Sequence, residues 1–309
     1  GVYVLEPAEP LPPMTQEDLE FERFQIKAVS AIEEELDRIL KTRKQSRIQT
    51  IADMVIRNYG HLDEKINFYQ NLRSLEDYVS RHSLNVAILC AMITHVMNIR
   101  REEQYHTVCA ALLHDMGKLK KHEDVYFGAP YSREDAIRNC ETQEEAYSVI
   151  EDAFATEGPA IRRICQQAAG KQLDLFPEEG KESRYKMLEG SNVLLVANRH
   201  DEITAMTLQG TAQSEVKAAQ ELLEHPEVYD PETVQALLRS INILPPGASV
   251  ELSTGEKALV LRENKENVLC PTVVSFRDNS ILDLALPQNE DIQIVDVMKT
   301  MDNRYILKK

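Results

Sequence analysis

Hydrophobic residues recur at helical spacing along most of the chain. From Phe21 to Ile39 they return every three or four positions, and Thr15 is a suitable N-cap, so a long amphipathic helix is expected there. Its apolar face could pack on the following domain or on a second subunit, and the pattern does not choose between them. From Ile48 to about Gly210 the pattern stays helical.

Within this helical region, Val86 to Met97 is apolar on nearly all sides, which predicts a central buried helix. The stretch from Gly170 to Lys186 combines glycine, proline and acidic residues and predicts an irregular surface loop. Two more helices are expected between Thr211 and Ser240.

The two ends of the chain differ from this helical region. Residues 1–14 read as a short strand and a proline-rich linker, and this abrupt opening suggests an upstream sensor or anchor. After the LPPG sequence, short alternating runs predict a small antiparallel β appendix. The expected organisation is therefore mainly α: a linker (1–14), an N-terminal helical region (15–71), a helical core (72–242) and a β-rich appendix (243–309).

Composition and charge narrow the function. With 309 residues and 43% hydrophobic composition, the chain can bury a sizeable core. It carries 35 basic and 51 acidic residues, a net charge of −16, which argues against duplex nucleic acid or an anionic membrane as partner. A small phosphorylated ligand remains compatible, because a metal or a few local cations can hold a phosphate. Scattered cysteines, no signal-peptide pattern and no apolar run long enough to span a bilayer favour a soluble, cytoplasmic protein.

Candidate chemistry lies in a few side chains spread along the helical core. His82 stands near a helix start, and His114 and Asp115 are adjacent at a helix end. Imidazole and carboxylate are suitable ligands for divalent metals, and such an ion can activate water and polarise a phosphoryl oxygen. Phosphodiester hydrolysis is the natural reaction. Lys118 follows the pair by one turn, and Asn198 and Asp201 lie three residues apart on one face of a later helix.

These segments resemble a known family, the HD superfamily of metal-dependent phosphohydrolases, and within it the HD-GYP class that hydrolyses cyclic di-GMP. The resemblance rests on RHSLNVA, ALLHDMGK and LLVANRHDEITA, in that order, and on the β tail ILPPGASVELSTGEKALVL. It spans roughly residues 72 to 285 and implies an HD-type helical bundle. It also implies that His82, His114, Asp115 and Asn198 are metal ligands and that Lys118 contacts a substrate phosphate.

The chain also departs from the HD-GYP pattern. Cys140 or Glu141 stands where the family has a histidine, and Gln166, Gln167 and Ala168 stand where it has two histidines and a glutamate. The GYP signature has no counterpart, and the ligand aspartate has become Asn198. What remains suits one weakly held iron, manganese or zinc ion, or none, so cyclic di-GMP hydrolysis is expected to be weak or absent.

Several roles remain open. Lys118 and Asp201 could form an ion pair that positions a phosphate in catalysis or only joins two helices. His200 is expected at the surface, as are most other histidines outside the cluster, unless they serve packing: His95, His106, His122 and His225.

Three functions fit these observations. The first is a degenerate HD-GYP-like module of a bacterial signalling protein, which binds a cyclic dinucleotide, another nucleotide or a protein partner. The second is an active mononuclear phosphodiesterase or nucleotidase. The third is a structural module that forms a homodimer and transmits a signal from an upstream domain.

Overall fold

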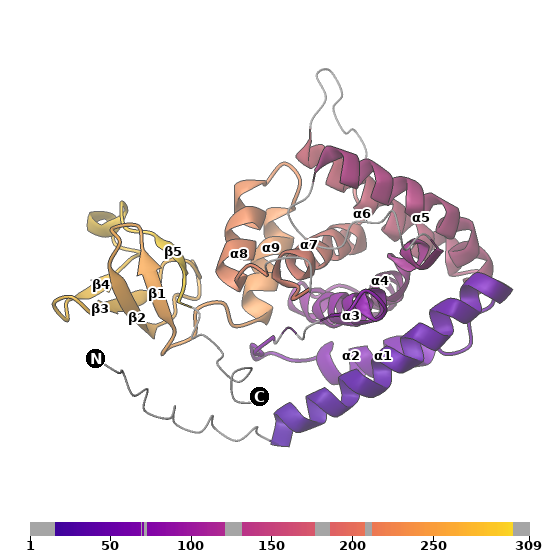
Figure 1. The fold of residues 1–309 in the computed structure, drawn as a ribbon, viewed down its shortest axis with the longest axis horizontal. Helices are drawn as coiled ribbons and strands as arrows, with labels where there is room; N and C mark the ends of the chain where they lie inside the picture. Colours follow the sequence, from indigo (N-terminus) through magenta and orange to yellow (C-terminus); the bar gives the residue numbers. More distant parts are fainter. Residues whose placement is uncertain are drawn as a thin grey trace, which may run out of the picture.

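The structure, a computed structural model, describes residues 16–68, 70, 73–120, 132–176, 186–207 and 212–298. A body of packed helices carries a small β-sheet at one side (Figure 1). The strand and linker expected over residues 1–14 lie outside the described residues. The predicted fold class, mainly α with a C-terminal antiparallel sheet, is confirmed.

The helices follow the hydrophobic pattern closely. Both helices expected between residues 211 and 240 are present. The bounds are α1 Gln16–Thr42, α2 Ile48–Tyr59, α3 Tyr78–Val96, α4 Arg101–Leu113, η1 Met116–Lys120, α5 Arg133–Phe154, α6 Gly158–Gln172, η2 Leu173–Leu175, α7 Glu189–Thr204, α8 Glu215–Glu224 and α9 Pro231–Ser240.

The loop expected from Gly170 starts later than predicted. Helix α6 continues to Gln172, and the 3-10 turn η2 follows it. A glycine inside a helix costs only about 1 kcal/mol relative to alanine. Burial of Ala168 and Gln172 against neighbouring helices offsets that cost. Residues 177–185 lie outside the described residues.

Helix α3 is the centre of the helical body, as its apolar sequence predicted. It packs against α1, α2, α4, α7 and α9, and nearly all of its side chains from Tyr78 to Thr94 are buried. Side chains on the first turns of α3 therefore lie deep inside the protein, where polar groups need hydrogen-bond partners.

Helix α1 packs on its own chain. Val29, Ile32, Leu36 and Ile39 form its buried face, which contacts α2, α3 and α5. The buried carboxylate of Glu35 accepts hydrogen bonds from the backbone of the α1–α2 connection. The sequence left open whether α1 packs on the following domain or on a second subunit. In the structure, the apolar face of α1 packs on the following domain.

The C-terminal sheet is antiparallel throughout, with strand order β4-β3-β2-β1-β5. Alternate residues such as Val250, Ala258, Val260 and Val273 face its buried side. The sheet meets the helical body where β5 contacts α8. The strands are β1 Ser249–Leu252, β2 Lys257–Arg262, β3 Thr272–Ser275, β4 Ile281–Asp283 and β5 Ile294–Val297, with a 3-10 turn η3 at Pro287–Asn289.

None of the helices in the described residues is long and apolar enough to cross a membrane.

Candidate metal centre

Four of the predicted site residues meet in the interior of the helical body. His82 comes from α3, His114 and Asp115 directly follow α4, and Asn198 lies on α7. The Nε2 atoms of the two histidines are 3.1 Å apart, and Asn198 Oδ1 lies 2.8 and 2.9 Å from them. Asp115 Oδ2 is 3.4 Å from His82 Nε2. Within the described part of the chain, the only three histidine, cysteine or acidic side chains close enough to share a metal ion are His82, His114 and Asp115.

The other nitrogen of each imidazole is already occupied. His82 Nδ1 lies 2.6 Å from the Asp201 carboxylate, and His114 Nδ1 lies 2.8 Å from the carbonyl oxygen of Ala111. Both partners can only accept, so each Nδ1 carries the proton. Burial lowers the pKa of His114, which favours its neutral form. In neutral rings, both Nε2 atoms then present lone pairs to the centre of the cluster.

The amide of Asn198 is also held in one orientation. Its Nδ2 donates to Glu202 Oε1 at 3.1 Å, one helical turn further along α7. A flipped amide would place its oxygen against this carboxylate, so Oδ1 faces the two histidines instead. Glu202 in turn accepts from Arg199 and Gln172.

With both rings neutral, two imidazole nitrogens, an amide oxygen and a carboxylate converge, which is an arrangement that a cation satisfies. Ligand atoms about 2.1 Å from a metal lie about 3.0 Å apart at right angles and about 3.4 Å apart in a tetrahedron. Four of the spacings at the cluster, from 2.8 to 3.4 Å, fit such an ion, and a fifth, from His114 Nε2 to Asp115 Oδ1, is longer at 3.8 Å. The donor set suits zinc, iron or manganese.

Lys118 does not pair with Asp201, which corrects that expectation. Its Nζ lies 2.6 Å from Asp115 Oδ2, and both side chains are 3% exposed. The reason is local, because η1 turns the chain so that the lysine reaches back to the carboxylate three residues earlier. Gln143 on α5 donates to the other oxygen of Asp115. The Lys118 ammonium holds the pKa of Asp115 below its usual range despite burial.

Asp201 instead pairs with Arg73, a residue that the sequence pattern did not single out. The guanidinium of Arg73 donates to both carboxylate oxygens at 2.7 and 2.8 Å, and both side chains are at most 1% exposed. Arg73 lies in the connection before α3, which a backbone hydrogen bond to Met206 ties to the end of α7. Arg73 and His82 hold the pKa of Asp201 well below its usual range. The connection has no hydrophobic period, so nothing in the sequence marked this arginine.

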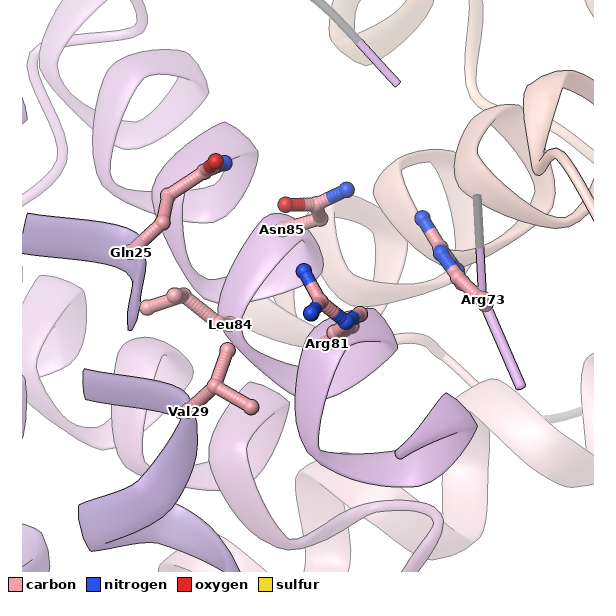
Figure 2. Close-up of a pocket in the computed structure, with 6 residues that line it drawn as sticks. All are labelled: Gln25, Val29, Arg73, Arg81, Leu84 and Asn85. Atoms are coloured by element: carbon pink, nitrogen blue, oxygen red, sulfur yellow. The ribbon is translucent and has the colours of Figure 1, made fainter. Parts of the chain in front are cut away.

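A small cavity lies next to Arg73 (Figure 2). Gln25 and Val29 of α1 face Arg81, Leu84 and Asn85 of α3 there, and Arg73 closes one side. Arg81 pairs with Asp77. The cavity holds only about 10 Å³, room for at most one water.

The prediction that His200 lies at the surface is wrong. Its side chain is buried, and within the described residues neither ring nitrogen has a hydrogen-bond partner. Burial lowers its pKa to about 4. Helix α7 is covered by α3, α4, α6, α8 and α9, so even its polar side chains are enclosed.

The remaining histidines agree better with expectation. His95 and His225 bond to Asp63 and Glu227 near the surface, and His106 lies against the ring of Tyr105. His122 lies outside the described residues.

The cavity beside the four-residue cluster is walled by amides and small side chains. It encloses about 20 Å³, room for one water. Its wall beyond the cluster includes Asn139, Gln143, Ala168, Ala169 and Gln172.

Of the residues expected at the missing ligand positions, only Ala168 lines this cavity. Cys140 bonds to the carbonyl oxygen of Ala169, and Gln167 accepts from Leu188 and Ser191 at the start of α7. Helical periodicity explains the offset, because the residues that point inward from α5 and α6 lie one to four positions from those aligned by motif.

A buried cluster of two histidines, an aspartate and an amide at the centre of a helical bundle defines a candidate metal-binding domain. In a comparison with protein families, residues 79–206 match the family model described as the HD domain. This segment contains His82, His114, Asp115 and Asn198. No curated protein and no solved structure matched the chain.

Proposed function

We propose that this chain is a degenerate HD-GYP-like signalling module that binds one divalent metal ion. His82, His114, Asp115 and Asn198 hold the ion. The module binds a cyclic dinucleotide, another phosphorylated small molecule or a protein partner, and its phosphodiester hydrolysis is weak or absent.

The observation that supports the metal site is the convergence of two imidazole Nε2 atoms, the Asn198 oxygen and the Asp115 carboxylate in a buried site. Lys118 and Gln143 donate to Asp115, but with both rings neutral the two imidazole lone pairs and the Asn198 oxygen would face one another without a donor, which is costly in a buried site. A bound divalent ion removes that repulsion and supplies Lewis acidity toward water and phosphoryl oxygen.

The side chains that line the cavity favour the binding of a single ion and slow hydrolysis. Beyond the four ligands, its described lining offers amides, alanines, leucines and one thiol, without further imidazole or carboxylate. Lys118 is engaged by Asp115 in a buried ion pair, so it is poorly placed to hold a substrate phosphate. Among the described residues that line the cavity there is no lysine or arginine, and a ligand set with one carboxylate favours binding over turnover.

Metal content is the decisive measurement. We expect about one equivalent of zinc, iron or manganese in the purified protein, and its loss in the double variant His114→Ala, Asp115→Ala. The variant His225→Ala is the matched control, because that half-exposed histidine bonds to surface Glu227 and lies outside the cluster. Protein that takes up no metal after reconstitution would overturn the proposal, and two equivalents would contradict a mononuclear site.

A second candidate function is an active mononuclear phosphohydrolase. The small space beside the cluster favours it, since one water there would lie next to the ion. Metal-loaded protein would be assayed with bis(p-nitrophenyl) phosphate, cyclic di-GMP and nucleoside monophosphates. Turnover that disappears in the double variant would support this enzyme over the binding module, whereas binding of cyclic di-GMP without turnover would support the module.

A further inference from the structure

We propose that Asp201, held in place by Arg73, is a positioning residue that fixes the tautomer of His82 and keeps Nε2 open toward the metal. This inference rests on the proposed metal site and adds a role for two residues outside its ligand set.

The Asp201 carboxylate receives five hydrogen bonds in a site closed to solvent. Oδ1 accepts from Arg73 Nη2, Gln70 Nε2 and Asn85 Nδ2 at 2.8, 2.8 and 3.0 Å. Oδ2 accepts from Arg73 Nη1 and His82 Nδ1 at 2.7 and 2.6 Å. Figure 2 shows Asn85 on α3 and Arg73 on the connection before that helix.

This arrangement permits only one neutral tautomer of His82. With the proton on Nε2, the Nδ1 lone pair would face a carboxylate oxygen 2.6 Å away. The proton therefore stays on Nδ1, and Nε2 points at His114 and Asn198 with its lone pair available. Arg73 balances the charge of Asp201, so the carboxylate stays ionised inside the protein.

The isosteric variant Asp201→Asn keeps the size of the side chain and changes only its charge and hydrogen bonding, so it tests the positioning role directly. Three donors meet at Oδ1 and two at Oδ2, so the amide oxygen takes the Oδ1 place and the amide nitrogen the Oδ2 place. This nitrogen then donates to His82 Nδ1, which moves the ring proton to Nε2 and blocks the metal ligand. We expect zinc affinity to fall by about 10- to 100-fold, the usual effect of losing an outer partner of a ligating histidine.

The test combines two readouts. Nitrogen-15 NMR of metal-free protein reports the tautomer of His82, and competition with a chromophoric chelator gives the zinc affinity. Wild type should show a protonated Nδ1, and Asp201→Asn a protonated Nε2 with weaker zinc binding. Arg73→Lys keeps the charge beside Asp201, so it should keep the wild-type tautomer.

Glu35→Gln is the matched control for loss of a buried carboxylate. Glu35 is 2% exposed and bonds to Ser46 and Arg47 at the α1–α2 connection. The variant Glu35→Gln should lower stability without changing the tautomer of His82 or the zinc affinity.

Each outcome decides between the proposals. A protonated Nε2 in wild-type protein would overturn the positioning role even if Asp201→Asn does not fold. Equal zinc affinity in wild type and Asp201→Asn would also overturn it, while leaving the metal site intact. Absence of zinc binding in wild type would refute the metal site, and the tautomer would still report on Asp201.

Discussion

Replacing Asn198 by aspartate is the sharpest test of how the cluster is built. The change exchanges the amide nitrogen, which donates to Glu202 Oε1 at 3.1 Å, for a carboxylate oxygen. Two unit charges at that separation repel by about 5 kcal/mol at an effective dielectric constant near 20. Proton uptake or a small shift of Glu202 relieves part of this, so Asn198→Asp should destabilise metal-free protein by about 2 to 5 kcal/mol.

The second half of this test removes the repulsion. In the double variant Asn198→Asp, Glu202→Gln, the glutamine amide can donate to the new carboxylate, so metal-free stability should return close to that of Glu202→Gln alone. The added negative ligand should then raise zinc affinity at least about tenfold, equivalent to about 1.4 kcal/mol.

Urea unfolding followed by circular dichroism, with chelator or with excess zinc, gives the stabilities. The chelator competition gives the affinities. If metal-free Asn198→Asp is as stable as wild type within about 0.5 kcal/mol, Asn198 does not donate to Glu202. In that case the convergence of acceptors described above is incorrect.

Two further substitutions test the surroundings of the site, and a third, with its control, tests the packing of α1. Lys118→Met removes the cation beside Asp115 and should lower the free energy of unfolding by about 3 to 5 kcal/mol in metal-free protein, and by less with zinc bound. A decrease below about 1 kcal/mol would show that the pair is not buried as described. Gly117→Ala would place a Cβ in steric conflict with the backbone oxygen of Thr142, so it should push η1 away from α5 and weaken zinc binding in the competition assay. Unchanged zinc affinity would contradict that close packing. Leu36→Ala on the buried face of α1 should cost about 2 to 5 kcal/mol in urea unfolding. Ile26→Ala, on a side chain 63% exposed, should cost little, and equal losses would mean that α1 does not pack as described.

The sequence predicted those features that local patterns determine. Helical periodicity located α1, α3, α8 and α9, and strict alternation located the sheet. The motifs also brought His82, His114, Asp115 and Asn198 under consideration together, because each stands at a helix end or on a helix face that its hydrophobic neighbours orient inward. Their role as ligands stays a prediction.

Partners that are distant along the chain could not be predicted. Arg73 and Asp201 are 128 positions apart, and no periodic pattern marks the connection that carries the arginine. Motif order alone does not tell which acidic group Lys118 reaches, and η1 brings the lysine to Asp115 rather than to Asp201. The burial of His200 could not be predicted because its neighbours are charged, and it is their ion pairs with distant residues that allow this part of α7 to be buried.

The run of polar residues on α7 has a consequence for the helix as a whole. Asn198, Arg199, His200, Asp201 and Glu202 are consecutive and all buried, and successive residues point about 100° apart. Asn198 faces the histidines, Arg199 faces Glu221 on α8, Asp201 faces Arg73, and Glu202 faces Gln172 on α6. A slip of α7 by one residue would break all of these pairs at once while leaving its many apolar positions tolerably packed. The polar run thus specifies the axial register of α7, which its hydrophobic residues alone would leave ambiguous.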